Sequence, residues 1–408
     1  MGPLEGVKII ELAGIGPGPM AAMQLADMGA TVLRIERREA VDLGVKRPLK
    51  FNLLLRNRQS IALDLKDPAS IRLVLDLVAQ ADALIEGFRP GVTERLGLGP
   101  EVCLARNPRL VYGRMTGWGQ AGPLSHAAGH DINYIALTGA LRAIGRKDQP
   151  PSIPLALVGD FGGGAMFLAM GVLAALVNAR STGLGQVVDA AIVDGVSSLA
   201  TAFHGLAAAG QWKDERGSNV LDSGAPFYDV YECSDGEWIS IGPLEARFHA
   251  DLLRRLEVDP SEIGEQFDEA DWPRARAVYQ RVFRTRSRAA WCELLEGTDV
   301  CFSPVLSFAE AAVHPHLKAR ETLIDVDGVV QPAPAPRFAR TPSERPRPPE
   351  PPLQGDALQD LLDRWLPAEQ SAAWRSSGFT PMRPAPTDLE ARGDIASSKG
   401  PVDRTQRQ

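Results

Sequence analysis

Short apolar runs typical of buried strands alternate with helical patterns from residue 5 to about residue 200. After Asp67 and Pro68, which suit a helix N-cap and first turn, apolar residues recur on one helical face. The strand-like runs are VKIIEL at 7–12, TVLRIER at 31–37, RQSIALDLK at 58–66, ADALIEGF at 81–88, RLVYGRMTGWG at 109–119 and GQVVDAAIV at 185–193. This alternation predicts an α/β fold, with a Rossmann-like parallel sheet covered by helices on both faces.

The pattern changes near residue 220. FYDVYECSDGEWISIG, at 227–242, places two alternating runs around a Ser-Asp-Gly turn and predicts a hairpin, and charged helices follow it. A proline-dense stretch and a polar end with few large apolar residues complete the chain. We predict a large CoA-binding α/β domain over 1–200, a linker helix or loop over 201–225, a small α+β domain over 226–325, a C-terminal segment over 326–380 that returns to the large domain, and a disordered tail over 381–408.

The first predicted strand leads into a glycine-rich turn, GIGPGP, at 14–19. A strand, a glycine turn, a helix and a second strand form the order that a dinucleotide-binding fold needs. After Gly14 and Gly16, however, the third fingerprint glycine belongs at position 19, where Pro19 stands. The spacing is therefore consistent with the fold and argues against a nicotinamide cofactor.

Bulk composition narrows the protein class. The 408 residues are 44% hydrophobic and 23% charged, as in ordinary soluble globular proteins, and the net charge of −7 argues against nucleic acid as a partner. Four cysteines without a C-x-x-C pair suggest neither a zinc site nor a disulfide framework. Because we find no signal peptide and no apolar run long enough to span a membrane, we expect a cytoplasmic protein without a membrane partner.

Three titratable residues are candidates for chemistry: His130 in AGHDINY, Asp160 in GDFGGG and Glu245 in GPLEARF. Asp160 is expected at the start of a long apolar helix that ends at Gly183, where free N–H groups favour an anion. Considered singly, each has a structural alternative: an N-cap aspartate, a structural histidine and a solvated surface glutamate. A basic cluster either contacts phosphates or forms a solvated face; it comprises Arg37, Arg38, Lys46, Arg47, Arg56 and Arg58.

These motifs, taken together, match a known family. The chain resembles the α-methylacyl-CoA racemases, a branch of the family III CoA-transferase superfamily. The resemblance runs from about residue 3 to about residue 345. Its segments include ELAGIGPGPMAAMQLADMGATVLRIER, EGFRPGVTERLGLGP, MTGWGQ, AGHDINYIALTG, GDFGGG, GQVVDAAIVDG, YECSDG and PAPRFART.

The resemblance implies a set of site residues. His130 and Asp160 correspond to the two acid/base residues of these racemases, and Glu245 corresponds to a glutamate that pairs with the histidine. The family's CoA contacts fall on Arg37, Leu63, Asp64, Leu65, Lys66, Gly87, Phe88, Arg89, Arg95, Gly129, Asp131, Ile132, Asn133 and Tyr134. The resemblance also implies an interlocked homodimer, with active sites between large and small domains.

The implied activity is inversion of the α-carbon of 2-methyl-branched acyl-CoA thioesters through an enolate. One group removes the α-proton while the other returns a proton to the opposite face, and backbone N–H groups near Asp160 receive the oxygen charge. This reaction needs neither a metal nor a redox cofactor, because CoA is part of the substrate. The alternatives are a CoA-transferase with Asp160 as nucleophile, a hydride-transferring oxidoreductase and a non-catalytic CoA-ester binding protein.

Overall fold

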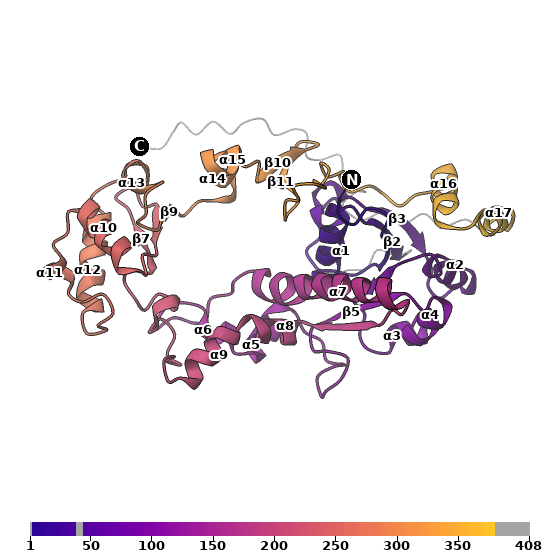
Figure 1. Cartoon of the computed structure of the whole chain (residues 1–408), viewed down its shortest axis with the longest axis horizontal. Coiled ribbons are helices and arrows are strands. Elements are labelled where there is room, and N and C mark those ends of the chain that lie inside the picture. The colour runs from indigo at the N-terminus through magenta and orange to yellow at the C-terminus, as the bar shows by residue number, and fades with distance from the viewer. Residues whose placement is uncertain (1, 38–43, 380–408) are drawn as a thin grey trace, which may run out of the picture. The chain divides into compact units, whose positions relative to one another are not determined.

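The computed structural model describes residues 2–37 and 44–379, which form two compact units (Figure 1). Unit 1 contains the described parts of 1–128, 160–195 and 324–379, and unit 2 contains 129–159 and 196–323. The domain boundaries drawn from the sequence stay a prediction. The predicted disordered tail, 381–408, lies outside the described residues.

A six-stranded parallel sheet is the centre of unit 1. The strand order is β3-β2-β1-β4-β5-β6. The strands are β1 (Lys8–Leu12), β2 (Thr31–Arg37), β3 (Gln59–Leu63), β4 (Ala83–Glu86), β5 (Val111–Thr116) and β6 (Val187–Ala191). The predicted Rossmann-like α/β fold is confirmed. Because the strand order reverses at β1 and β4, the crevice outside their carboxyl ends is where open α/β sheets bind ligands.

Helices cover both faces of this sheet. On one face lie α1 (Pro17–Asp27) and α7 (Phe167–Thr182), and a Cβ on Gly113 of β5 would come within 3.1 Å of Leu168 and Val172 of α7. The other face packs against α2 (Pro68–Val78), α4 (Pro100–Arg106) and α16 (Gly355–Trp365) in one buried apolar cluster. Members of that cluster include Leu12, Ile35, Tyr112, Leu73, Val74, Cys103, Leu361 and Trp365.

The sequence explains where α2 begins. The Asp67 carboxylate accepts hydrogen bonds from the backbone N–H groups of Ala69 and Ser70, at 3.2 and 3.0 Å, and Pro68 occupies the first turn. This satisfies donors that a helix start otherwise leaves unpaired. The remaining elements of unit 1 are η1 (Leu49–Phe51), η2 (Leu53–Leu55), α3 (Val92–Arg95), the first half of α8 (Ile192–Leu199), the β10–β11 pair (Leu323–Val326 and Val329–Pro332) and α17 (Ala368–Ser376).

One helical stretch, Leu157–Thr182, is long and apolar enough to cross a membrane by length and composition alone. Its α7 portion buries Leu168, Val172 and Leu176 inside unit 1. Core helices of soluble proteins share this composition, so the predicted absence of a membrane partner stays a prediction.

Unit 2 is built around an antiparallel sheet. The predicted hairpin is β7 (Asp229–Glu232) with β8 (Trp238–Ile241), and β9 (Phe302–Pro304) pairs with β8. A buried aromatic core supports it, with Tyr231 stacked on Phe283. The helices are α5 (Asp131–Leu137), α6 (Ala140–Ala143), α9 (Thr201–Ala208), η4 (Val220–Asp222), α10 (Ala246–Leu256), α11 (Pro260–Ile263), α12 (Trp272–Phe283), α13 (Arg288–Leu295), α14 (Phe308–Val313) and α15 (Pro315–Ala319).

Candidate active site

Asp160 lies directly against the glycine turn that follows β1. Gly16 has φ 66° and ψ −119°, a conformation almost restricted to glycine, and a Cβ there would lie 2.8 Å from Asp160 Oδ2. Arg34 stabilises the turn, because it is ion-paired to the buried Glu11 and donates a hydrogen bond to the Gly14 carbonyl at 3.3 Å. The glycine turn therefore packs directly against the half-buried Asp160 carboxylate at the carboxyl edge of the sheet.

The helix that carries Asp160 begins earlier than predicted. A π-helical segment, η3 (Leu157–Met166), precedes α7, so Asp160 lies in its first turn and is not its N-cap. A first turn still contains N–H groups without intrahelical acceptors, so the expected affinity for negative charge is retained. Gly195 permits close packing of this segment, since a Cβ there would lie 1.8 Å from the Gly163 carbonyl oxygen. The predicted end at Gly183, with φ 79°, is confirmed.

Several predicted CoA contacts of unit 1 gather at the same edge of the sheet. Arg37 ends β2 and pairs in register with Leu63, which ends β3. The Arg37 guanidinium carbon lies 5.0 Å from the centroid of the Phe88 ring, which follows β4. Asp64 shapes the turn after β3 by accepting from the backbone N–H of Lys66 at 2.9 Å. Gly87 and Arg89 flank Phe88 and are exposed.

A pocket of about 530 Å³ lies beside these residues and carries three cations. It is lined by Lys66, Arg72 and Arg95, together with Leu65, Pro68, Ile71 and Leu96. Lys66, Leu65 and Arg95 were predicted from the resemblance, whereas Arg72 was missed. The available signal was the position of Arg72 in the helix that begins at Pro68, about one turn after that proline. Three cations around one pocket suit the phosphates of a nucleotide.

The predicted basic cluster separates into different roles. Arg56 is buried in an ion pair with Asp27, and Arg58 is buried in an ion pair with Glu11, so these two do not contact a phosphate. Lys46 and Arg47 are exposed. Arg38 lies outside the described residues.

His130 and the rest of its motif belong to unit 2, whereas Asp160 belongs to unit 1. His130 is exposed at the N-cap of α5, where its backbone N–H donates to Asn133 Oδ1 at 3.0 Å. The Tyr134 hydroxyl donates a hydrogen bond to the Gly129 carbonyl at 2.5 Å, which ties the residue before His130 to α5. Asp131 is half-buried and Ile132 is exposed.

Glu245 is the exposed N-cap residue of α10. Burial first, and the charge of Glu245 second, raise the pKa of the Cys301 thiol, so these side chains are neighbours. Within the described residues, no hydrogen bond or ion pair joins Glu245 to His130. The predicted pairing of these two residues stays a prediction.

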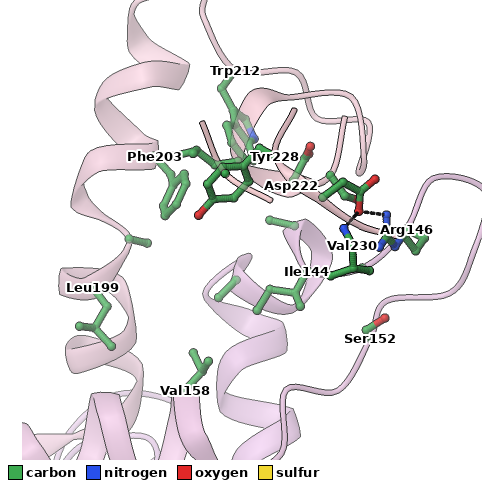
Figure 2. A pocket seen from close by; sticks show the side chains of 18 of the residues that line it. Ile144, Arg146, Ser152, Val158, Leu199, Phe203, Trp212, Asp222, Tyr228 and Val230 are labelled. Atoms are coloured by element: carbon green, nitrogen blue, oxygen red, sulfur yellow. Dashed lines mark hydrogen bonds and ion pairs between the residues drawn. The ribbon is translucent and has the colours of Figure 1, made fainter. Parts of the chain in front are cut away.

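A larger pocket, of about 1130 Å³, lies within unit 2 (Figure 2). Its wall is mostly aliphatic and aromatic, with Leu199, Phe203, Trp212, Leu221, Tyr228 and Cys301 among the lining residues. At one side the buried Asp229 carboxylate is ion-paired with Arg146 and accepts from the Val230 N–H at 2.7 Å. None of the predicted site residues lines this pocket. It is suited to an apolar group.

A metal site was not predicted. Among residues 2–37 and 44–379, no three or more His, Cys, Asp or Glu side chains form a group that could hold a metal ion.

Comparison with known proteins decides the family. A family model described as CoA-transferase family III matches residues 4–357. The chain belongs to CoA-transferase family III.

Curated relatives and solved structures agree with this membership. The chain is 42% identical to mouse alpha-methylacyl-CoA racemase over 341 residues, which cover 83% of this chain and 87% of the mouse protein. It is 39% identical to the human alpha-methylacyl-CoA racemase over 363 residues, covering 89% and 93%. A CAIB/BAIF family protein from Brucella suis superposes with a TM-score of 0.74 at 26% identity, covering 92% of this chain and 99% of that protein. The predicted resemblance to the racemase branch of the family is confirmed.

Proposed function

We propose that the protein is an isomerase that inverts the α-carbon of 2-methyl-branched acyl-CoA thioesters. One observation carries the proposal: a half-buried carboxylate, Asp160, sits on the glycine turn at the carboxyl edge of the sheet, where the predicted CoA contacts gather. The similarity to mouse and human racemases along most of the chain supports the same reaction.

Two groups carry the proton transfers in this mechanism. Asp160 and His130 act as the acid/base pair: one takes the α-proton as the other protonates the opposite face of the carbon. Negative charge then develops on the thioester oxygen, and the backbone N–H groups in the first turn of η3 are suitable donors to it. Glu245 is assigned the role of orienting the histidine.

Deuterium exchange tests this proposal. A purified 2-methylacyl-CoA epimer is incubated with the protein in D₂O and followed by proton NMR. We expect loss of the α-proton signal and formation of both epimers from either one, and suppression of both in Asp160→Asn and His130→Asn. If the α-proton persists while CoA moves to an added carboxylate, the protein is instead a CoA-transferase with Asp160 as nucleophile.

The acyl group is assigned to the apolar pocket of unit 2. Leu221, Phe203 and Tyr228 supply its apolar wall, and burial of each methylene contributes about 0.8 kcal/mol. We expect Leu221→Asp to raise KM for a long branched acyl-CoA more than for a short one. An equal effect on both substrates would assign the pocket to another ligand.

We further propose that the protein is a homodimer. Helix α9 buries none of its residues within the chain, and large apolar side chains of α7, Met170 and Val177, are 58% and 72% exposed. Apolar surfaces of this kind commonly mark contacts between subunits. Light scattering after gel filtration should give twice the mass of the 43.9 kDa chain, and Val177→Glu in α7 should favour the monomer.

The setting of the reaction is also a proposal. We assign the protein to the cytoplasm and to lipid and fatty acid metabolism, with no nucleic-acid partner at a net charge of −7. Proton transfer at a thioester α-carbon requires no added cofactor, so racemisation should survive gel filtration in the presence of a chelator.

A further inference from the structure

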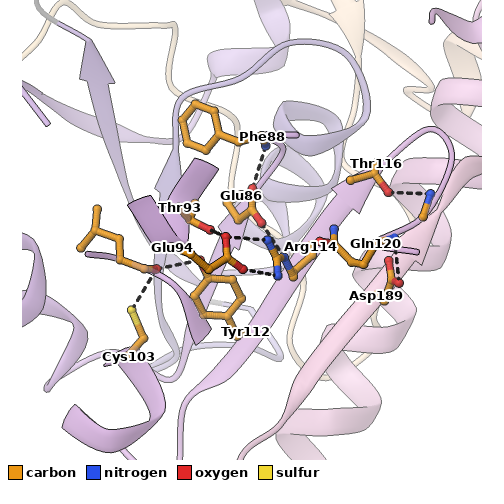
Figure 3. Close-up of polar contacts among 12 residues, drawn as sticks. Glu86, Phe88, Thr93, Glu94, Cys103, Tyr112, Arg114, Thr116, Gln120 and Asp189 are labelled. Carbon is orange, nitrogen blue, oxygen red and sulfur yellow. Dashed lines mark hydrogen bonds and ion pairs between the residues drawn. The ribbon is translucent and has the colours of Figure 1, made fainter. Parts of the chain in front are cut away.

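A buried carboxylate holds the start of the segment that carries four predicted CoA contacts (Figure 3). We call residues 87–95, which include α3, the CoA segment. Glu86 ends β4 directly before it and is 1% exposed. Glu86 Oε2 accepts from the Phe88 backbone N–H at 2.7 Å, and Oε1 accepts from Arg114 Nε at 2.8 Å.

Arg114 on β5 extends this contact to the other end of the CoA segment. Its Nη1 donates to Glu94 Oε1 at 2.8 Å, and its Nη2 lies 3.4 Å from Oε2. Glu94 immediately precedes Arg95, one of the cations of the 530 Å³ pocket. One guanidinium therefore connects both ends of the CoA segment to the sheet.

Neutral contacts secure the chain beyond the segment. The Tyr112 hydroxyl donates to the Leu98 carbonyl at 2.8 Å, and Cys103 Sγ donates to the same oxygen at 3.3 Å. Burial raises the pKa of Tyr112 and raises that of Cys103 to about 12, so neither group ionises near neutral pH. The charge-dependent part of the anchorage is the Glu86–Arg114–Glu94 cluster.

We propose that Glu86, acting with Arg114 and Glu94, positions the CoA segment, and that loss of the negative charge of Glu86 weakens CoA binding. The effect passes through Phe88, whose backbone N–H is held by Glu86 and whose ring faces the Arg37 guanidinium at 5.0 Å. The three residues are positioning residues and touch no reacting atom. The inference rests on the proposed function, which assigns CoA to this edge.

The surroundings of Glu86 determine the pH range in which its carboxylate takes up a proton and loses its charge. Burial raises its pKa to about 7, against the opposing effects of the Phe88 N–H and Arg114. Burial acts to raise the pKa of Glu94, but the hydrogen bond from Arg114 lowers it overall, and Arg114 stays cationic. Among the charged and titratable groups that face Glu86, namely Arg114, Glu94 and Tyr112, none changes charge near pH 7. A protonated Glu86 has less capacity to accept from both donors.

The test measures CoA affinity apart from turnover. Calorimetric titration with CoA at about pH 6 and about pH 8 is combined with racemisation kinetics for the wild type, Glu86→Gln and Glu94→Gln. Gln at 86 keeps the shape and one acceptor, and burial favours a neutral side chain there, so the variant should fold. Glu101→Gln is the matched control, since it removes an exposed carboxylate of α4 outside the cluster.

We expect wild-type CoA binding to weaken several-fold from about pH 8 to about pH 6. Glu86→Gln should bind about tenfold more weakly than the wild type at the higher pH, through KM with kcat nearly unchanged. Its affinity should change less with pH, whereas Glu101→Gln should follow the wild type. Glu94→Gln, whose partner Arg114 remains paired to Glu86, should lose less.

The outcomes separate the two proposals. If Glu86→Gln keeps both wild-type affinity and wild-type pH dependence, the positioning role is refuted while the racemase is not. If the wild type fails to bind CoA at either pH, the proposed function itself fails. A fall in kcat with unchanged KM would also overturn the positioning role.

Discussion

The contact between Asp160 and Gly16 gives a sharp prediction for Gly16→Ala. The added Cβ would stand 2.8 Å from Asp160 Oδ2, whereas ordinary contact begins at 3.4 Å. The carboxylate oxygen must therefore move by the difference, about 0.6 Å. Because the obstructing atom is the end of a side chain, rotation of the Asp160 carboxylate relieves the clash without unfolding the turn.

The expected effect on catalysis follows from this displacement. A misplacement of 1 Å in an active site costs about 10²-fold in rate, so a shift of 0.6 Å should slow α-proton exchange roughly tenfold. The alanine backbone at φ 66° and ψ −119° adds about 1 to 3 kcal/mol of destabilisation. We therefore expect a folded, less stable protein with a lower kcat.

Gly14→Ala is the matched control in the same turn. Gly14 lies outside the positive-φ region, and no atom stands within 4 Å of the position that a Cβ would take there. Exchange of the α-proton is measured in D₂O for both variants, beside thermal unfolding. If folded Gly16→Ala catalyses α-proton exchange as fast as Gly14→Ala, the contact between Gly16 and Asp160 does not control the reaction.

Two further predictions concern binding and stability. Arg72→Ala should raise KM for CoA thioesters severalfold and reduce its salt dependence, while a pantetheine thioester, which lacks the nucleotide, should be unaffected; equal effects on both would remove Arg72 from the nucleotide pocket. His249, whose Nε2 lies 2.7 Å from the Tyr279 hydroxyl, has its pKa lowered by burial to about 4. Since the unfolded state takes up this proton below about pH 6.5 and the folded state does not until about pH 4, the free energy of unfolding should fall by about 2 to 3 kcal/mol from pH 6.5 to 4. Urea unfolding of His249→Phe should show a smaller fall in the free energy of unfolding between pH 6.5 and 4. If the fall is as large as in the wild type, groups other than His249 cause it.

Much of the fold was predictable because its signals are local. Apolar runs bounded by turns located the strands of the parallel sheet and the hairpin β7–β8, and Asp67 with Pro68 located the start of α2. Such signals depend on residues a few positions apart, which stay neighbours in any fold. The motifs around His130, Asp160 and Glu245 indicated the family for the same reason: each is a short contiguous segment.

Tertiary structure decided which side chains meet. Arg56 and Arg58 read as members of a basic cluster, yet the fold buries them against Asp27 and Glu11. The contact of Asp160 with Gly16 joins residues 144 positions apart in numbering, and Glu86 reaches Arg114 across two neighbouring strands. Strand order and register create these contacts, and no local pattern in the chain encodes them. The sequence alone thus determined the elements and the family, while burial and long-range pairing determined which charges are structural and which face a ligand.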